Sequence, residues 1–145
     1  MTPKIAVIGL GDFGMSIALS VAAKGAEVIA IDKNMEPVEE IKDKVAYAAK
    51  LDSTDEKALK SLGIDQVDVV IISIGKDFES SILTSVLILQ MGIKRVVARA
   101  SSLIQEKILK KLGVHQVVLP EFETAKRMAS SLMNEDILDY VPLDD

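Results

Sequence analysis

The stretch KIAVIGLGDFGMSIALSVAAKGAEVIAIDKN, residues 4–34, decides the fold that this chain is expected to adopt. It contains an apolar run, the triplet Gly9-x-Gly11-x-x-Gly14, a helical pattern and a second apolar run that closes with Asp32. Three glycines alone are weak evidence. A triplet between a buried strand and a helix, with an acid 18 residues after the last glycine, is typical of a dinucleotide-binding turn.

Each residue of the triplet has a physical role in such a turn. Gly9 allows the chain to turn sharply out of the strand, Gly11 lets a phosphate approach the backbone, and Gly14 lets the helix pack closely on the sheet. The helix is expected to begin around Asp12 and Phe13, with its free N–H groups and the positive end of its dipole facing the phosphates.

Asp32 is expected to end the second strand and to accept hydrogen bonds from the hydroxyls of an adenosine ribose. A carboxylate at this position repels a 2′-phosphate. The turn therefore favours NAD, ADP or ATP over NADP as the ligand. The alternative is a turn of the same shape that has lost its ligand.

The rest of the chain alternates short apolar runs with helical patterns. Strands are predicted at Lys4–Ile8, Glu27–Ile31, Val45–Ala49, Val67–Ile72, Arg95–Ala100 and Gln116–Leu119. Because crossovers between parallel strands are right-handed and the glycine turn follows the first strand, we predict an α/β, Rossmann-like, doubly wound parallel sheet in the order 3-2-1-4-5-6. Ser53 or Thr54 is expected to cap the third helix, and Gly113 to end the fifth.

Composition limits the classes of protein and partner that the chain can represent. The 145 residues suit one domain, and 49% hydrophobic residues suffice for its core. Without cysteine, a signal peptide or a membrane-spanning run, the chain is expected to be soluble and cytoplasmic. A net charge of −5 and only 3% aromatic residues argue against a nucleic-acid partner.

Two segments carry more apolar surface than the sheet can cover. In the helix predicted near Phe78–Met91, apolar residues occupy most of the circumference: Ile82, Leu83, Val86, Leu87, Ile88 and Leu89. A second apolar helix is marked by Ala125, Met128, Ala129 and Leu132 and is expected to run on to Val141. We expect these surfaces to pack on a second copy of the chain; the alternative is that both pack within the monomer.

Several motifs, taken together, resemble the RCK domains (regulators of potassium conductance), and specifically the nucleotide-binding ring subunits of Ktr- and Trk-type potassium uptake systems. The motifs span essentially the whole chain: GLG-x-FG at Gly9–Gly14, AIDKN at Ala30–Asn34, LDSTDEKALKSLGI at Leu51–Ile64, VDVVIISIG at Val67–Gly75, ARAS at Ala98–Ser101, ILKKLGVHQVVLPE at Ile108–Glu121 and AKRMA at Ala125–Ala129. Their joint order is more specific than the glycines alone.

The resemblance implies roles for residues at the ends of the strands. Lys33 would join Asp32 at the ribose, while Asp52 and Ser53 would lie against the adenine edge. It further implies that Ile74 covers a base or ribose face and that Gly75 allows close approach of the ligand.

Two charged residues of the later strands are also implicated by the resemblance. Arg99 would approach the phosphates, and Glu121 would point into the same crevice, where it could help to coordinate a divalent cation or sodium. The alternative is that Arg99 and Glu121 form an ordinary salt bridge.

Asp12 departs from the pattern of Ktr-type relatives, several of which carry arginine here. A carboxylate beside a triphosphate is unfavourable unless a cation or Arg99 intervenes, so ADP, AMP or NAD(H) gain weight against ATP. The alternative is that Asp12 does not contact the ligand and is simply an acidic residue in the first turn of the helix, where the helix dipole stabilises a negative charge.

Taken as a whole, the resemblance implies a regulatory subunit that is not an enzyme. It would bind an adenine nucleotide with residues 1–133, and residues 134–145 would form a C-terminal connecting segment. The family's second regulatory lobe is not in this sequence, which would then be either an isolated N-terminal domain or a naturally short subunit. Dimers, joined in an octameric ring, would gate a membrane potassium transporter subunit. The alternative is an NAD-dependent oxidoreductase or its cofactor domain, although His115, the only histidine, is expected at the surface and away from the crevice.

Overall fold

A computed structural model describes residues 2–134 of the chain. Its sheet contains six parallel strands: β1 (Lys4–Ile8), β2 (Glu27–Asp32), β3 (Tyr47–Lys50), β4 (Val69–Ile72), β5 (Arg95–Arg99) and β6 (Gln116–Val118). They lie in the order β3-β2-β1-β4-β5-β6, which confirms the predicted fold class and topology. The strand predictions agree to within two residues at every end, and β2 ends at Asp32.

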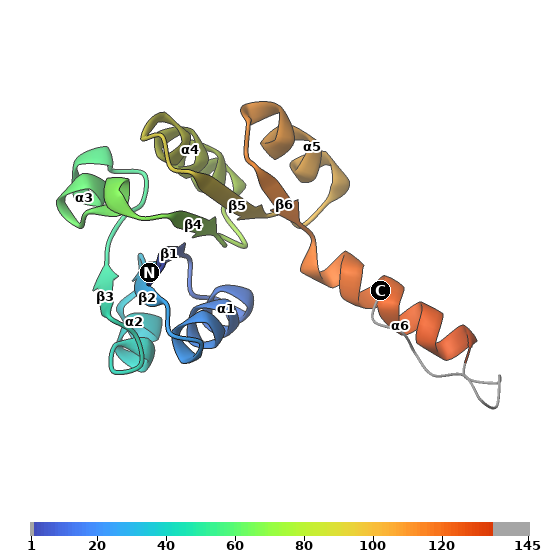
Figure 1. Cartoon of the computed structure of the whole chain (residues 1–145). Coiled ribbons are helices and arrows are strands. Elements are labelled where there is room, and N and C mark those ends of the chain that lie inside the picture. Colours follow the sequence, from blue (N-terminus) through green and yellow to red (C-terminus); the bar gives the residue numbers. More distant parts are fainter. Residues whose placement is uncertain (1, 135–145) are drawn as a thin grey trace.

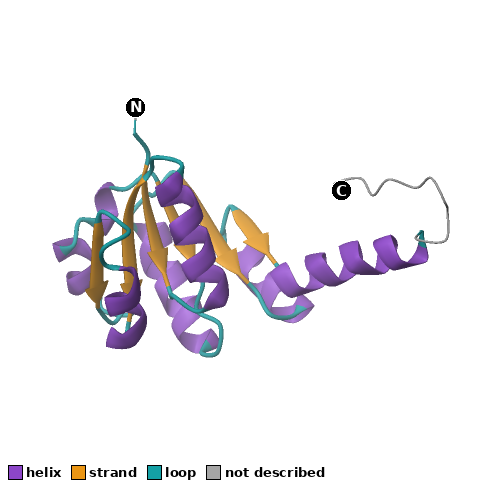
Figure 2. Cartoon of the chain, turned by 90° about the horizontal axis from the view of Figure 1, so that it is seen from below, coloured by secondary structure: helices purple, strands orange, loops and turns teal. Residues whose placement is uncertain are grey.

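Helices cover both faces of the sheet (Figures 1 and 2). One face is covered by α1 (Asp12–Ala23) and α2 (Met35–Ile41), whose buried side chains join one core cluster. The other carries α3 (Glu56–Ser61), the short 3₁₀ helix η1 (Ile64–Gln66), α4 (Phe78–Gln90) and α5 (Leu103–Leu112), which contribute to a second cluster. None of the helices in residues 2–134 is long and apolar enough to cross a bilayer.

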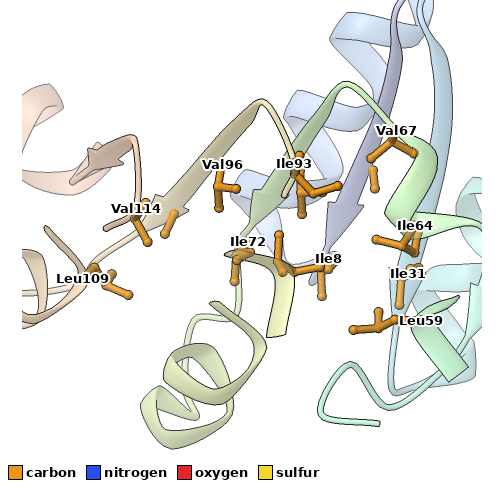
Figure 3. Close-up of a cluster of buried hydrophobic side chains, with 14 of the residues drawn as sticks. Ile8, Ile31, Leu59, Ile64, Val67, Ile72, Ile93, Val96, Leu109 and Val114 are labelled. Carbon is orange, nitrogen blue, oxygen red and sulfur yellow. The ribbon is translucent and has the colours of Figure 1, made fainter. Parts of the chain in front are cut away.

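The larger core cluster joins the centre of the sheet to this second helical layer (Figure 3). Ile8 and Ile72 come from the adjacent strands β1 and β4, while Leu59, Ile64 and Leu109 come from α3, η1 and α5. Each of these side chains is at most 2% exposed. The cluster therefore fixes the two central strands, whose carboxyl ends bound the candidate site.

The polarity of α4 is unusual for a helix that covers a sheet. Its fully buried residues are Ser81, Thr84, Ser85 and Ile88, whereas the side chain of Leu83 is 46% exposed. Three hydroxyl groups therefore lie on its buried side beside Ile88, while Phe78, Leu87 and Leu89 are half-buried against the core. Apolar surface on its outer side was predicted from the sequence, and Leu83 supplies it.

The predicted cap of the third helix is wrong. Asp55 caps α3, since its carboxylate accepts a hydrogen bond from Ala58 N at 3.2 Å. Neither Ser53 nor Thr54 is free for this role, because their hydroxyls bond to other side chains. Gly113 ends α5 as predicted, with a left-handed φ of 105°.

The last described helix, α6 (Pro120–Met133), projects from the body of the domain (Figures 1 and 2). None of its residues is buried, and Phe122, Met128, Leu132 and Met133 are 46–80% exposed. Within residues 2–134, this helix does not pack in the core of its own chain. The expected continuation to Val141 and the connecting segment from 135 onward lie outside the described residues.

Candidate functional site

A cleft of about 740 Å³ opens where the strand order reverses, at the carboxyl ends of β1 and β4. This is the position at which open α/β sheets bind ligands, and the volume suits a nucleotide-sized molecule. Twelve of the thirteen predicted site residues line it: Gly9, Gly11, Asp12, Phe13, Asp32, Lys33, Asp52, Ser53, Ile74, Gly75, Arg99 and Glu121. Gly14 is buried behind the turn instead.

The three glycines of the turn have different surroundings. Gly9 has a left-handed φ of 99°, and a Cβ there would lie 2.5 Å from the carbonyl oxygen of Ser73. At Gly14, a Cβ would lie 1.8 Å from the carbonyl oxygen of Gly9. A Cβ on Gly11 would meet nothing within 4 Å. Gly9 and Gly14 therefore shape the turn, while Gly11 leaves open space beside the start of α1.

The start of α1 is a suitable place for an anion. Gly11 is the N-cap and contributes no side-chain cap, and Asp12 and Phe13 begin the helix at the wall of the cleft. The first N–H groups of a helix have no partner within it and carry partial positive charge. They can bind phosphate, although the Asp12 carboxylate beside them opposes a highly charged tail.

Asp32 holds the glycine turn in addition to facing the cleft. Its Oδ2 accepts a hydrogen bond from Leu10 N at 2.7 Å, and its Oδ1 accepts one from Asn34 N at 2.8 Å. Each carboxylate oxygen keeps further acceptor capacity for a ligand hydroxyl. The sequence indicated that Asp32 would bind a ligand hydroxyl, but it gave no sign that Asp32 also holds the glycine turn.

The loop after β3 forms another wall of the cleft. Asp52 Oδ1 accepts hydrogen bonds from the hydroxyl and the backbone N–H of Thr54, at 2.6 and 2.9 Å, and these bonds lower the pKa of the Asp52 carboxyl. Ser53 is only 8% exposed, and its hydroxyl lies 2.8 Å from that of Thr84 on α4. The Ser53 hydroxyl is therefore bonded to the helix behind the loop.

The loop between β4 and α4 contributes residues that the sequence did not indicate as ligand contacts. Asp77 caps α4 by accepting hydrogen bonds from the Ser80 hydroxyl at 2.6 Å and from Ser80 N at 3.1 Å, which lowers the pKa of its carboxyl. Both residues line the cleft beside Ile74 and Gly75. The pattern Asp77-x-x-Ser80 after an apolar strand is a capping signal that could have revealed them.

Arg99 crosses from β5 to the β4 loop. A Cβ on Gly75 would lie 2.7 Å from Arg99 Nη1, so the missing side chain makes room for the guanidinium group. Arg99 Nη2 lies 3.6 Å from Glu121 Oε1, while Nε is buried with no hydrogen-bond partner among the described residues. The Glu121 side chain is 82% exposed, so this ion pair is weak and leaves Arg99 available to an anion.

The charge of the cleft limits what it can bind. Its lining includes five acidic residues, Asp12, Asp32, Asp52, Asp77 and Glu121, and three basic ones, Lys33, Lys76 and Arg99. Arg99, Lys33, Lys76 and the start of α1 are the groups that can attract an anionic ligand against this acidic lining. The more negative the ligand, the more it needs an accompanying cation.

No cluster of three metal-ligating side chains occurs in the part of the chain that the structure describes. Among the described residues, Glu121 pairs with Arg99 and belongs to no cluster of three such side chains. His115 is exposed at the start of β6, where its Nδ1 accepts a hydrogen bond from Val96 N at 2.8 Å. This confirms its predicted position at the surface, outside the cleft lining.

Comparisons with known proteins agree with this architecture. The family model of the TrkA-N domain matches residues 5–120. Ktr system potassium uptake protein C of Bacillus subtilis (strain 168) is 38% identical over 143 residues, covering 99% of this chain and 65% of that protein. The chain spans about 65% of the length of the Ktr relatives it matches. These relatives are named as potassium uptake proteins and not as enzymes.

Solved structures show the same fold. The GsuK RCK domain is 26% identical with a TM-score of 0.77, over 92% of this chain and 29% of that one. Structures of GsuK bound to NAD and to ADP are 12% identical, with TM-scores of 0.69 and 0.68. They cover 81% of this chain and 21% and 31% of theirs, and at this identity they show the fold alone.

Proposed function

This chain belongs to the TrkA-N domain family, and on that premise we propose that it is a regulatory domain that binds an adenine nucleotide and controls a potassium uptake system. One observation carries the proposal. The cleft at the strand switch point combines an open Gly11, the free start of α1 and Asp32 at the end of β2. Those groups match the phosphate and the ribose of one ligand.

In the proposed complex, the phosphates lie over Gly11, with the N–H groups of Asp12 and Phe13 and the guanidinium group of Arg99 as donors. Gly9 and Gly14 act indirectly, by shaping the turn.

The ribose hydroxyls bind Asp32, with Lys33 beside them at the mouth of the cleft. The base lies toward Asp52 and the backbone of Ser53, and Ile74 and Gly75 cover its other side. GsuK, which shares this fold, has been solved with NAD and with ADP, and this supports the same classes of ligand here.

A cation, divalent or sodium, would bind at Glu121 only together with the phosphates. Because Glu121 alone provides one carboxylate, most ligands of the ion would have to be phosphate oxygens and water. The cation would also offset the acidic lining, so ATP needs it more than ADP or NAD(H) does.

The proposed partner is a membrane potassium transporter subunit, with this chain in the cytoplasm at the inner face of the membrane. Residues 1–133 would form the nucleotide-binding domain. Pairs of these domains, joined into an octameric ring, would change their relative orientation when the nucleotide binds and would pass that change to the transporter. The names of the Ktr relatives, which are potassium uptake proteins, support a role in potassium uptake. A ligand can drive such a ring only if it binds one arrangement better than the other.

Isothermal titration of the purified chain with ADP, ATP, NAD and NADP tests the ligand. We expect the first three to bind and NADP to bind at least tenfold more weakly, because Asp32 repels its 2′-phosphate. Failure of all four to bind at millimolar concentration would overturn the nucleotide assignment. Turnover of an alcohol or hydroxy acid with bound NAD would instead favour an oxidoreductase.

A further inference from the structure

Thr84 lies in the middle of α4, fully buried, yet it contacts the loop after β3. Its Oγ1 lies 2.8 Å from Ser53 Oγ and donates to the Ser53 carbonyl oxygen at 3.3 Å. When Thr84 donates to the carbonyl, the Ser53 hydroxyl donates to Thr84 in turn. Both hydroxyl protons are then donated within the Ser53–Thr84 pair, whose members are 31 residues apart in sequence.

We propose that Thr84 is a positioning residue for the base side of the nucleotide cleft. The inference rests on the proposed function, because it concerns the same cleft. Thr84 does not line the cleft, whereas Ser53 and its neighbour Asp52 do. Thr84 acts through them, by holding the loop at a fixed distance from α4.

The other attachments of this loop lie on its own side of the cleft. Leu51 N donates to the Asp32 carbonyl oxygen at 2.9 Å, which continues the pairing of β3 with β2. Asp52 bonds to Thr54 through its carboxylate and to Asp55 through its carbonyl oxygen, which accepts from Asp55 N at 3.1 Å. Among the hydrogen bonds of the described residues, those of Thr84 alone tie residues 51–54 to α4.

This attachment matters because the start of α4 also lines the cleft. Asp77 and Ser80 face the ligand space from the first turn of the helix, one to two turns before Thr84. The Ser53–Thr84 pair therefore sets the separation of two walls of the cleft.

Burial makes the pair sensitive to the loss of one hydroxyl. Replacing Thr84 with valine keeps the shape but leaves both the hydroxyl and the carbonyl of Ser53 without their partner. A buried polar group without a partner is strongly disfavoured, so the loop is expected to move until water reaches it. The apparent affinity for a nucleotide then falls in proportion to the fraction of molecules with the loop in place.

The test compares Thr84→Val with Thr84→Ser, which keeps the hydroxyl, and with the control Ser85→Ala. Ser85 is equally buried on α4, but its one hydroxyl bond within residues 2–134 goes to Ser81 O of the same helix, at 2.7 Å. Binding of ADP is measured by isothermal titration, and hydrogen exchange of the amides of residues 51–55 is measured without ligand.

We expect Thr84→Val to weaken ADP binding about tenfold and to speed exchange in residues 51–55. Thr84→Ser and Ser85→Ala should stay within about twofold of the wild type in both measurements. If Thr84→Val does not fold, as judged by circular dichroism, Ser53→Ala removes the Ser53 hydroxyl and leaves the bond from Thr84 to the Ser53 carbonyl oxygen, so a smaller weakening in the same direction is expected.

Two results would overturn the inference while leaving the proposed function intact. One is a Thr84→Val or Ser53→Ala variant that binds ADP as the wild type does. The other is a Ser85→Ala variant that weakens binding equally, since the effect would then come from the helix in general. If the wild-type chain binds no ADP, the proposed function and this inference fall together.

Discussion

At the scale of single residues, Asp32 both orders the glycine turn and faces the space for the ligand. Its two carboxylate oxygens accept hydrogen bonds from the N–H groups of Leu10 and Asn34, so Asp32 orders the turn that would receive the phosphates. A ligand hydroxyl then meets a carboxylate that is already oriented. Preorganisation of this kind raises affinity, because less freedom is lost on binding.

Replacing Asp32 with alanine is expected to weaken binding of ADP and NAD by roughly tenfold to a hundredfold, or about 1.5–3 kcal/mol. The loss combines the missing ribose contacts with a looser glycine turn. Asn34→Ala is the control, because Asn34 bonds to Asp32 through its backbone N–H. Titration calorimetry measures both, and unchanged affinity in Asp32→Ala would contradict the ribose assignment.

Asp12 is the residue that should distinguish ligands by the length of their phosphate tail. Asp12→Arg replaces repulsion with a charge-assisted contact, so it should strengthen ATP binding more than AMP binding. Asp12→Asn removes only the charge and should give a smaller change in the same direction. Equal effects of Asp12→Arg on the two ligands, in parallel titrations, would show that residue 12 does not sense the tail.

At the scale of elements, the sequence pattern predicted the strands and the helix end that depend on neighbouring residues of the chain. The strands, their order and the end of α5 at Gly113 follow from apolar runs, the glycine turn and a glycine stop. The cap of α3 did not follow, because the Ser53 hydroxyl is engaged by Thr84, a partner that only the folded sheet brings near. Ser80 differs, because its partner Asp77 is only three residues away and the local capping pattern was available in the sequence.

The observed cap can be tested through stability. Asp55→Ala should lower the free energy of unfolding by about 1 kcal/mol, because the first turn of α3 loses its side-chain acceptor. Glu56→Ala, which breaks only an exposed ion pair with Lys60, should change the free energy by no more than about 0.5 kcal/mol. Urea denaturation provides the comparison, and equal losses in the two variants would argue against Asp55 as the cap.

At the scale of the molecule, α6 exposes an apolar face that nothing in residues 2–134 buries. It is a helix of 14 residues with none buried, and a helix of that length is only marginally stable alone in water. Phe122, Ala125, Ala129 and Leu132 share one face of it at 100° per residue. Apolar surface on a projecting helix is typical of an interface, and we expect a second copy of the chain to cover it.

The final prediction concerns this interface. Leu132 is 58% exposed, so Leu132→Asp should leave the fold of the body intact while placing a charge in a buried apolar contact between copies. Ser130→Asp adds the same charge to the polar face of α6 and serves as the control. Light scattering should report a dimer or larger for the wild type and for Ser130→Asp, and a smaller species for Leu132→Asp. A wild-type chain that is monomeric at micromolar concentration would refute self-association through α6.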